Sequence, residues 1–424
     1  MGVATTYNPG SMSRANASLL FSLLLSAWPA FSADPPPGTT PNDEIDPATG
    51  LARSTVVRPL ADPSRLAAPV PPAPGPRALP PGAVPGVLPA APNAPTPVPP
   101  GPAAPKRPHI ALILPTASTT LGKLADAVRQ GFLAAAEAGG KETVPVVVTA
   151  VDNEAQALVD GCRQAQATGA LAIVGGLTRD GATTIATSDC ARLPVLALNE
   201  PRDALPTVYA FPLSLEHEAK QAALAAVNDG LKSAIVVHTP SPLSRRVEEA
   251  FEREWSRAGG EVRRILYTGS PDELAAIRER LANTRADVVF LALDHGDARD
   301  VRPYLHAALP VYATSMSVNP RAETLVNLDL QGVRYGEMPW FAQPDHLAVM
   351  AYPQPKAPLP LEEERLYAFG IDAFRVAFAL LKGDPAKISI DGVTGHIALE
   401  AGRVFTRLPQ PVEIDGGKLI PLRP

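Results

Sequence analysis

Polar side chains recur where predicted strands end and helices begin, and such positions can bind a small ligand. Hydroxyl groups and free backbone N–H groups at a helix start can hold a carboxylate, and an aspartate can bind an ammonium group. Six residues meet this description: Ser118, Thr119, Thr178, Asn199, Asp294 and Thr314. The same residue types also cap helices without binding a ligand, so the pattern leaves both a ligand cleft and ordinary capping open.

Groups that would catalyse a reaction or hold a metal ion are sparse. None of the seven histidines has the spacing of a metal motif. Asp294, His295 and Asp297 form an acidic–histidine cluster that is more typical of a helix start than of a metal site. The chain has no GxSxG nucleophile motif and no glycine-rich phosphate loop. We therefore expect a protein that is not an enzyme and has no metal site and no cofactor.

Strands and helices that alternate along the body of the chain must position these residues. His109–Leu114 is a continuous apolar run, typical of a strand buried on both faces. Leu121–Gly139 carries an apolar stripe with helical spacing and ends in glycines. The alternation repeats to Ala313, with one set of elements before Phe211 and another after it. This pattern predicts parallel sheets covered by helices, in which ligands bind beyond the carboxyl ends of the strands.

We therefore predict an α/β fold with two doubly wound parallel-sheet lobes and a cleft between them, over residues 109–424. The expected boundaries are about 109–212 and 338–385 for lobe 1, and about 213–337 and 386–424 for lobe 2.

The segment after the last parallel strand of lobe 2 is expected to cross between the lobes. It runs through Tyr335, Met338 and Trp340, and a late helix over Pro360–Leu381 follows it and should return to lobe 1. We expect Met338 and Trp340 to pack beneath the crossing. The alternative, a surface loop, would leave Trp340 exposed.

Residues 1–33 have the features of a signal peptide. Arg14 precedes an apolar stretch over Ser18–Trp28, and Ala30 and Ser32 are small residues suited to cleavage. The stretch is short for a membrane span, and an uncleaved anchor is the alternative. The export signal leads us to expect a periplasmic protein. Because no cysteine lies near the signal for lipid attachment, we expect no lipid anchor.

Residues 34–108 form a proline-rich tract. The interval 35–108 holds 24 of the 49 prolines of the chain. Proline fixes φ and lacks the N–H that helices and central strands require. We expect a disordered linker with much polyproline II conformation, and a partner-binding PxxP segment is the alternative.

The two cysteines, Cys162 and Cys190, are expected to form a disulfide, because export leads to an oxidising compartment. Cys162 lies in the helix after the second strand, and Cys190 ends the helix after the third. With strands ordered 2-1-3-4, right-handed crossovers place these helices side by side on one face. The alternative is a pair of buried thiols that act as small apolar residues.

Several segments of the body match one known family in the same order along the chain. They are Leu112–Pro115, Ala127–Ala135, Leu193–Asn199, Ala286–Leu293, Pro310–Ser315, Asp329–Trp340, Arg365–Arg375 and Gly392–Gly395. Through them the body resembles the C-terminal domain of the penicillin-binding protein activator family, the LpoA/LppC-like outer-membrane lipoproteins, which has the type I periplasmic-binding-protein fold. Larger members carry an N-terminal helical-repeat domain and a lipid-modified cysteine, and here the proline-rich tract stands in that place.

The resemblance implies a non-enzymatic regulator of peptidoglycan synthesis whose partner is a class A penicillin-binding protein. The alternative is a periplasmic solute-binding receptor for an amino acid or a similar small polar ligand, which requires a deep polar pocket. The net charge of −5 argues against a nucleic-acid partner.

Overall fold

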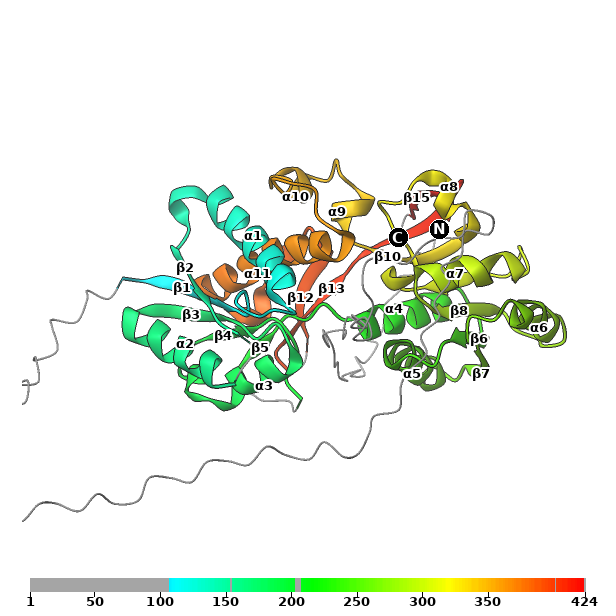
Figure 1. The fold of residues 1–424 in the computed structure, drawn as a ribbon, viewed down its shortest axis with the longest axis horizontal. Helices are drawn as coiled ribbons and strands as arrows, with labels where there is room; N and C mark the ends of the chain where they lie inside the picture. The colour runs from blue at the N-terminus through cyan, green and yellow to red at the C-terminus, as the bar shows by residue number, and fades with distance from the viewer. Residues whose placement is uncertain (1–106, 153–154, 203–206, 401, 423–424) are drawn as a thin grey trace, which may run out of the picture. The chain divides into compact units, whose positions relative to one another are not determined.

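The computed structural model describes residues 107–152, 155–202, 207–400 and 402–422. The expected signal peptide and all but the last two residues of the expected linker lie outside these ranges. Two sheets organise the described part of the chain (Figure 1). No helix within that part is long and apolar enough to span a membrane.

The first sheet has eight strands, in the order β11-β12-β13-β5-β4-β3-β1-β2. Its strands are β1 (His109–Leu114), β2 (Val146–Ala150), β3 (Ala170–Gly175), β4 (Val195–Ala197), β5 (Tyr209–Ala210), β11 (Ser389–Asp391), β12 (His396–Glu400) and β13 (Val404–Leu408). The strands β1 to β5 pair in parallel, and β1 to β4 have the predicted order 2-1-3-4.

Short 3-10 turns connect several of the elements in both lobes. Those of the described chain are η1 (Gly140–Glu142), η2 (Asp189–Arg192), η3 (Arg302–Tyr304), η4 (Ser315–Ser317), η5 (Leu328–Leu330) and η6 (Pro385–Lys387).

Helices cover both faces of the first sheet, as the continuous apolar run of β1 requires. Ile110 and Leu112 pack into the same core as α1 (Gly122–Ala138) and α11 (Leu361–Lys382). Ala111 and Ile113 face the other side, where α2 (Ala155–Thr168) and α3 (Arg179–Thr187) pack. Both faces are buried because side chains alternate along a strand.

The second sheet has seven strands, in the order β15-β14-β10-β9-β8-β6-β7. They are β6 (Ser233–His238), β7 (Glu261–Leu266), β8 (Val288–Ala292), β9 (Val311–Ala313), β10 (Val333–Glu337), β14 (Gln410–Asp415) and β15 (Lys418–Pro421). One face packs against α4 (Leu215–Asn228) and α5 (Pro242–Arg257), and the other against α6 (Pro271–Ala282) and α7 (His295–Val301). The connections contain the short helices α8 (Thr324–Asn327), α9 (Pro339–Ala342) and α10 (Leu347–Met350).

The two-lobed α/β fold is confirmed, but the expected boundary at the C-terminal end is wrong. The sequence pattern assigns 386–424 to lobe 2, whereas β11, β12 and β13 extend the first sheet. There β13 pairs in parallel with β5, through Val404 and Ala210. The physical reason is that Ile397 and Phe405 are fully buried in the core of the first lobe. The second sheet receives only β14 and β15 of this region.

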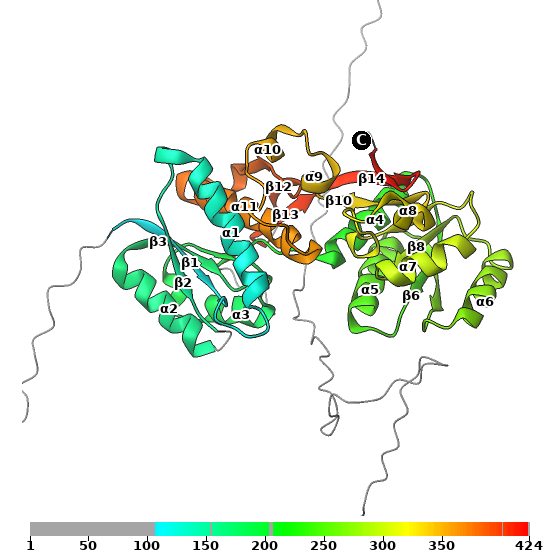
Figure 2. The same ribbon diagram turned by 45° about the horizontal axis from the view of Figure 1, so that its top comes forward.

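The chain crosses between the lobes at the segment expected to do so. Tyr335 belongs to the core of the second lobe, and Met338 and Trp340 belong to the core of the first. Trp340 is only 1% exposed. A further crossing joins β13 to β14, visible as the red strands of Figure 2.

A disulfide joins Cys162 and Cys190, whose Cα atoms lie 5.2 Å apart. The position of Cys190 differs slightly from the expected one, because the residue lies in the turn η2 that follows α3, not in α3 itself.

Candidate functional site

Three of the six residues predicted to line a ligand cleft cap helices or turns. Thr178 accepts a hydrogen bond from the Gly181 N–H at 2.9 Å and caps α3. Asp294 accepts one from the Asp297 N–H at 3.0 Å and caps α7. Ser118 accepts one from the Leu121 N–H at 3.3 Å. These contacts fit the capping alternative, and ligand binding by these residues stays a prediction.

The other three predicted residues differ in burial. Asn199 is buried beside the turn that precedes α3, where its amide donates to the Leu177 carbonyl at 3.0 Å. Thr314 is also buried, and its hydroxyl oxygen has no hydrogen-bond partner among the described residues. Thr119 is exposed. The structure thus brings Asn199 close to Thr178 but does not place all six on one open surface.

No local sequence pattern predicts the buried ion pair that joins the lobes at the crossing through Tyr335 and Trp340. Arg365 on α11 donates two hydrogen bonds to Glu337 at the end of β10, at 2.7 and 2.9 Å. The two side chains are 6% and 0% exposed. Burial alone would lower the pKa of Arg365, but the Glu337 carboxylate outweighs it and holds this pKa above its ordinary value.

A second buried ion pair also joins the two lobes. Arg407 on β13 donates to Glu218 on α4 at 3.0 Å. The other oxygen of Glu218 accepts the Ser315 N–H at 2.9 Å. Burial lowers the pKa of Arg407, and the Glu218 carboxylate opposes that shift.

A third contact across the lobes surrounds Glu364, which precedes Arg365 on α11. Its carboxylate accepts from Arg321 Nε at 3.1 Å and from Trp340 Nε1 at 3.0 Å. Arg321 and Arg365 both stack over the Phe341 ring. The first turn of α11 therefore holds residues of the second lobe through charged and aromatic contacts.

A polar cluster lies where the first lobe leads into α4. Glu216 on α4 accepts from Arg246 Nε at 3.0 Å, and burial raises the pKa of Glu216. Burial lowers the pKa of Arg179 on α3, and the carboxylates of Glu200 and Glu216 oppose this shift. The buried Nε of Arg179 has no hydrogen-bond partner among the described residues. Such a mixture of guanidinium and carboxylate groups is the chemistry that a zwitterionic solute would need.

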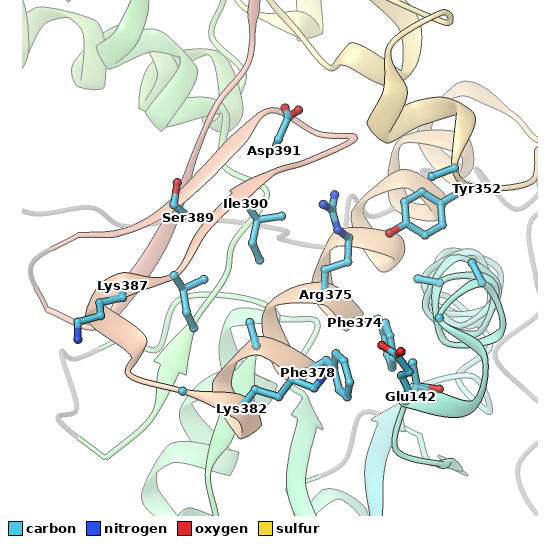
Figure 3. A pocket seen from close by; sticks show the side chains of 18 of the residues that line it. Glu142, Tyr352, Phe374, Arg375, Phe378, Lys382, Lys387, Ser389, Ile390 and Asp391 are labelled. Carbon is cyan, nitrogen blue, oxygen red and sulfur yellow. The ribbon is translucent and has the colours of Figure 1, made fainter.

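An open groove of about 800 Å³ lies between the C-terminal ends of α1 and α11 and the strand β11 (Figure 3). Phe374, Phe378 and Ile390 give it apolar walls. Arg375 points into the groove between Tyr352 and β11. No local sequence pattern predicts this groove.

Comparison with known protein families shows the family to which the chain belongs. Residues 104–410 match the family described as "LppC putative lipoprotein". The chain belongs to this family. The matched residues include all of the first sheet and most of the strands of the second.

Relatives of this LppC-family chain are penicillin-binding protein activators. The activator LpoA of Edwardsiella piscicida is 26% identical over 322 residues, which cover 64% of this chain and 46% of that protein. The activator LpoA of Escherichia coli K12 is 26% identical over 319 residues, covering 64% and 47%. The match thus spans slightly less than half the length of these relatives.

Solved structures share the fold of this LppC-family chain. The C-domain of LpoA (YraM) from Haemophilus influenzae, described as a regulator of PBP1A, has a TM-score of 0.61 and 23% identity, covering 74% of this chain and 100% of that one. A structure described as a putative branched-chain amino acid ABC transporter from Chromobacterium violaceum has a TM-score of 0.63 and 35% identity, covering 72% and 99%.

Proposed function

We propose that this chain is a non-catalytic periplasmic protein that binds and activates a class A penicillin-binding protein. The observation that carries the proposal is the match of residues 104–410 to the LppC family, together with the 26% identity to proteins named penicillin-binding protein activator LpoA. In this proposal, residues 1–33 direct export, and residues 34–108 are a linker that lets the folded body reach its partner.

The buried ion pairs between the lobes support a role in binding a protein. A solute receptor works by closing two lobes around its ligand, which requires contacts that reform at low cost. Here Arg365–Glu337 and Arg407–Glu218 are desolvated on both sides, and separating such charges is costly. A body whose lobes are joined in this way is suited to present a constant surface to a partner.

The test adds the purified full chain to the purified class A penicillin-binding protein of the same organism. We expect saturable binding and an increased rate of glycan polymerisation or peptide cross-linking. Absence of binding at micromolar concentrations of both proteins would contradict the proposal.

A second candidate function is a receptor for an amino acid or a similar solute. Two observations favour it: the 35% identity to the Chromobacterium violaceum structure and the cluster of Arg179, Glu216 and Arg246. A thermal-shift screen with amino acids distinguishes it, because a ligand at 100 times its Kd stabilises the folded state by about 2.7 kcal/mol.

A further inference from the structure

We propose that the groove between α1, α11 and β11 is the docking site for an extended segment of the partner synthase in which one carboxylate is flanked by apolar side chains. This inference rests on the proposed function, because it assigns the partner to a particular surface. The groove lies on the first lobe, away from the ion pairs that join the lobes.

A buried carboxylate, that of Asp372, holds the Arg375 side chain in its position in the groove. Asp372 is 0% exposed and accepts three hydrogen bonds: from the Val393 N–H at 3.2 Å, and from the Thr394 N–H and hydroxyl at 2.7 Å each. Arg375 Nη1 donates to the same carboxylate at 3.1 Å. Because Asp372 is buried and held by hydrogen bonds from Val393 and Thr394, it orients the guanidinium that it binds.

The guanidinium of Arg375 retains donors for an external acceptor. The bond to Asp372 uses only Nη1, and no other hydrogen bond of this side chain occurs within the described residues. The side chain of Arg375 is 24% exposed, and its guanidinium carbon lies 5.8 Å from the centre of the Tyr352 ring. A guanidinium with free N–H groups on one edge is suited to a carboxylate, which it can bind through two parallel hydrogen bonds.

Apolar side chains lie on both sides of this donor. Phe374 and Phe378 stack on α11, with ring centres 5.7 Å apart. Ile390 faces them from β11 (Figure 3), and Ile388, which precedes β11, also lines the groove. Phe378 is only half-buried, whereas Phe374, Ile388 and Ile390 already belong to the core of the first lobe. An apolar side chain that flanks the carboxylate of a bound segment would therefore pack mainly against Phe378.

The charges of the groove disfavour a polyanion. Its described lining contains three cations and three carboxylates, so it carries no net charge: Arg375, Lys382 and Lys387, against Glu142, Asp384 and Asp391. Lys382 has no ion pair among the described residues and stands over the Phe378 ring at 4.1 Å. A nucleic acid or another polyanion would meet the acidic rim, whereas a single carboxylate would reach the central cation.

An extended conformation of the bound segment follows from β11. This strand is the outermost strand of the first sheet, and its residues line the groove. The outer side of an edge strand can pair with an added strand from another protein. Main-chain pairing along β11 would therefore hold the segment while Arg375 binds its carboxylate.

The experiment measures the affinity of the full chain for the purified class A penicillin-binding protein by biolayer interferometry. Arg375→Gln removes the group that donates to the carboxylate. Ala351→Glu places a negative charge at an exposed position on the groove rim, where it would repel the carboxylate of the bound segment, and leaves Asp372 and its partners intact. The control is Ala225→Glu, an equal change at an exposed position of α4 in the second lobe. We expect both groove variants to weaken binding at least tenfold and the control to leave it within twofold.

The outcomes separate this proposal from the proposed function. Strong binding by the unaltered chain that Ala351→Glu leaves within twofold would overturn the docking site and keep the function. No binding by the unaltered chain would overturn both. Analytical ultracentrifugation adds a further outcome. If Ala351→Glu dissociates a dimer of this chain without changing its affinity for the synthase, the groove binds a second copy, and the proposal is wrong.

Discussion

Gly131 of α1 and Gly370 of α11 lie where the two helices touch backbone to backbone. A Cβ atom on Gly131 would overlap the carbonyl oxygen of Tyr367, and one on Gly370 would overlap the carbonyl oxygen of Val128. Figures 1 and 2 show the two helices side by side. This contact sets the position of α11, and α11 carries both Arg365 of the crossing and Arg375 of the groove.

The first prediction concerns this helix contact. Gly131→Ala would force the backbones of α1 and α11 apart, which we expect to lower the free energy of unfolding by about 1–3 kcal/mol. Urea denaturation measures the change. The matched control is Gly296→Ala in α7, where a Cβ meets only Asp294 Oδ1, at an ordinary contact distance of 3.5 Å. Equal stability of the two variants would show that the helices are not in close contact.

The second prediction concerns the ion pair at the crossing. Glu337→Gln leaves the Arg365 guanidinium buried without a counter-charge, so we expect a loss of about 3–5 kcal/mol of folding stability. The exposed pair Arg163–Asp160 provides the control, because Asp160→Asn should cost less than about 1 kcal/mol. Denaturant titration of both variants tests this difference. A loss at Glu337 as small as that at Asp160 would contradict the buried pairing.

The third prediction concerns acid stability. Burial, together with the charges of Arg407 and Lys220, lowers the pKa of His217 from 6.5 to about 3. Between these values the unfolded chain binds a proton at this histidine and the folded chain does not. Stability that is present above pH 6.5 is therefore lost as the pH falls, at up to about 1.4 kcal/mol per pH unit.

The variant His217→Gln should flatten this part of the stability profile, measured by urea denaturation from pH 7 to pH 4. His306→Gln serves as the control, because His306 is exposed. This variant should leave the slope unchanged. A slope that both variants leave equal to that of the unaltered chain would assign the acid sensitivity to other groups.

The fourth prediction concerns the disulfide between Cys162 and Cys190. It closes a loop of 28 residues, so the double variant Cys162→Ser/Cys190→Ser should lose about 3–4 kcal/mol of stability by the chain-entropy estimate. Thiol titration of the unfolded, non-reduced chain should find no free thiol. Two free thiols per chain would contradict the bridge.

Local patterns in the sequence were enough to predict the two-lobed α/β architecture, the order of the first four strands of the first sheet and the crossing at Trp340. Residues 109–114 form a continuous apolar run because both faces of β1 are covered, and that requirement is visible in the strand itself. The disulfide was predictable for a related reason: once strands alternate with helices, the handedness of the connections decides which helices are neighbours.

The tertiary structure alone decided where β11 to β13 belong and which charges meet. A hairpin such as His396–Leu408 has the same alternating pattern whichever sheet it extends, so only the packing of Phe405 assigns it to the first lobe. Glu218 and Arg407 are 189 residues apart in the sequence, and nothing local to either predicts the other. The groove combines α1, α11 and β11 in the same way. Secondary structure follows from short-range patterns, whereas ion pairs and grooves depend on how distant segments pack, and that packing is a property of the whole chain.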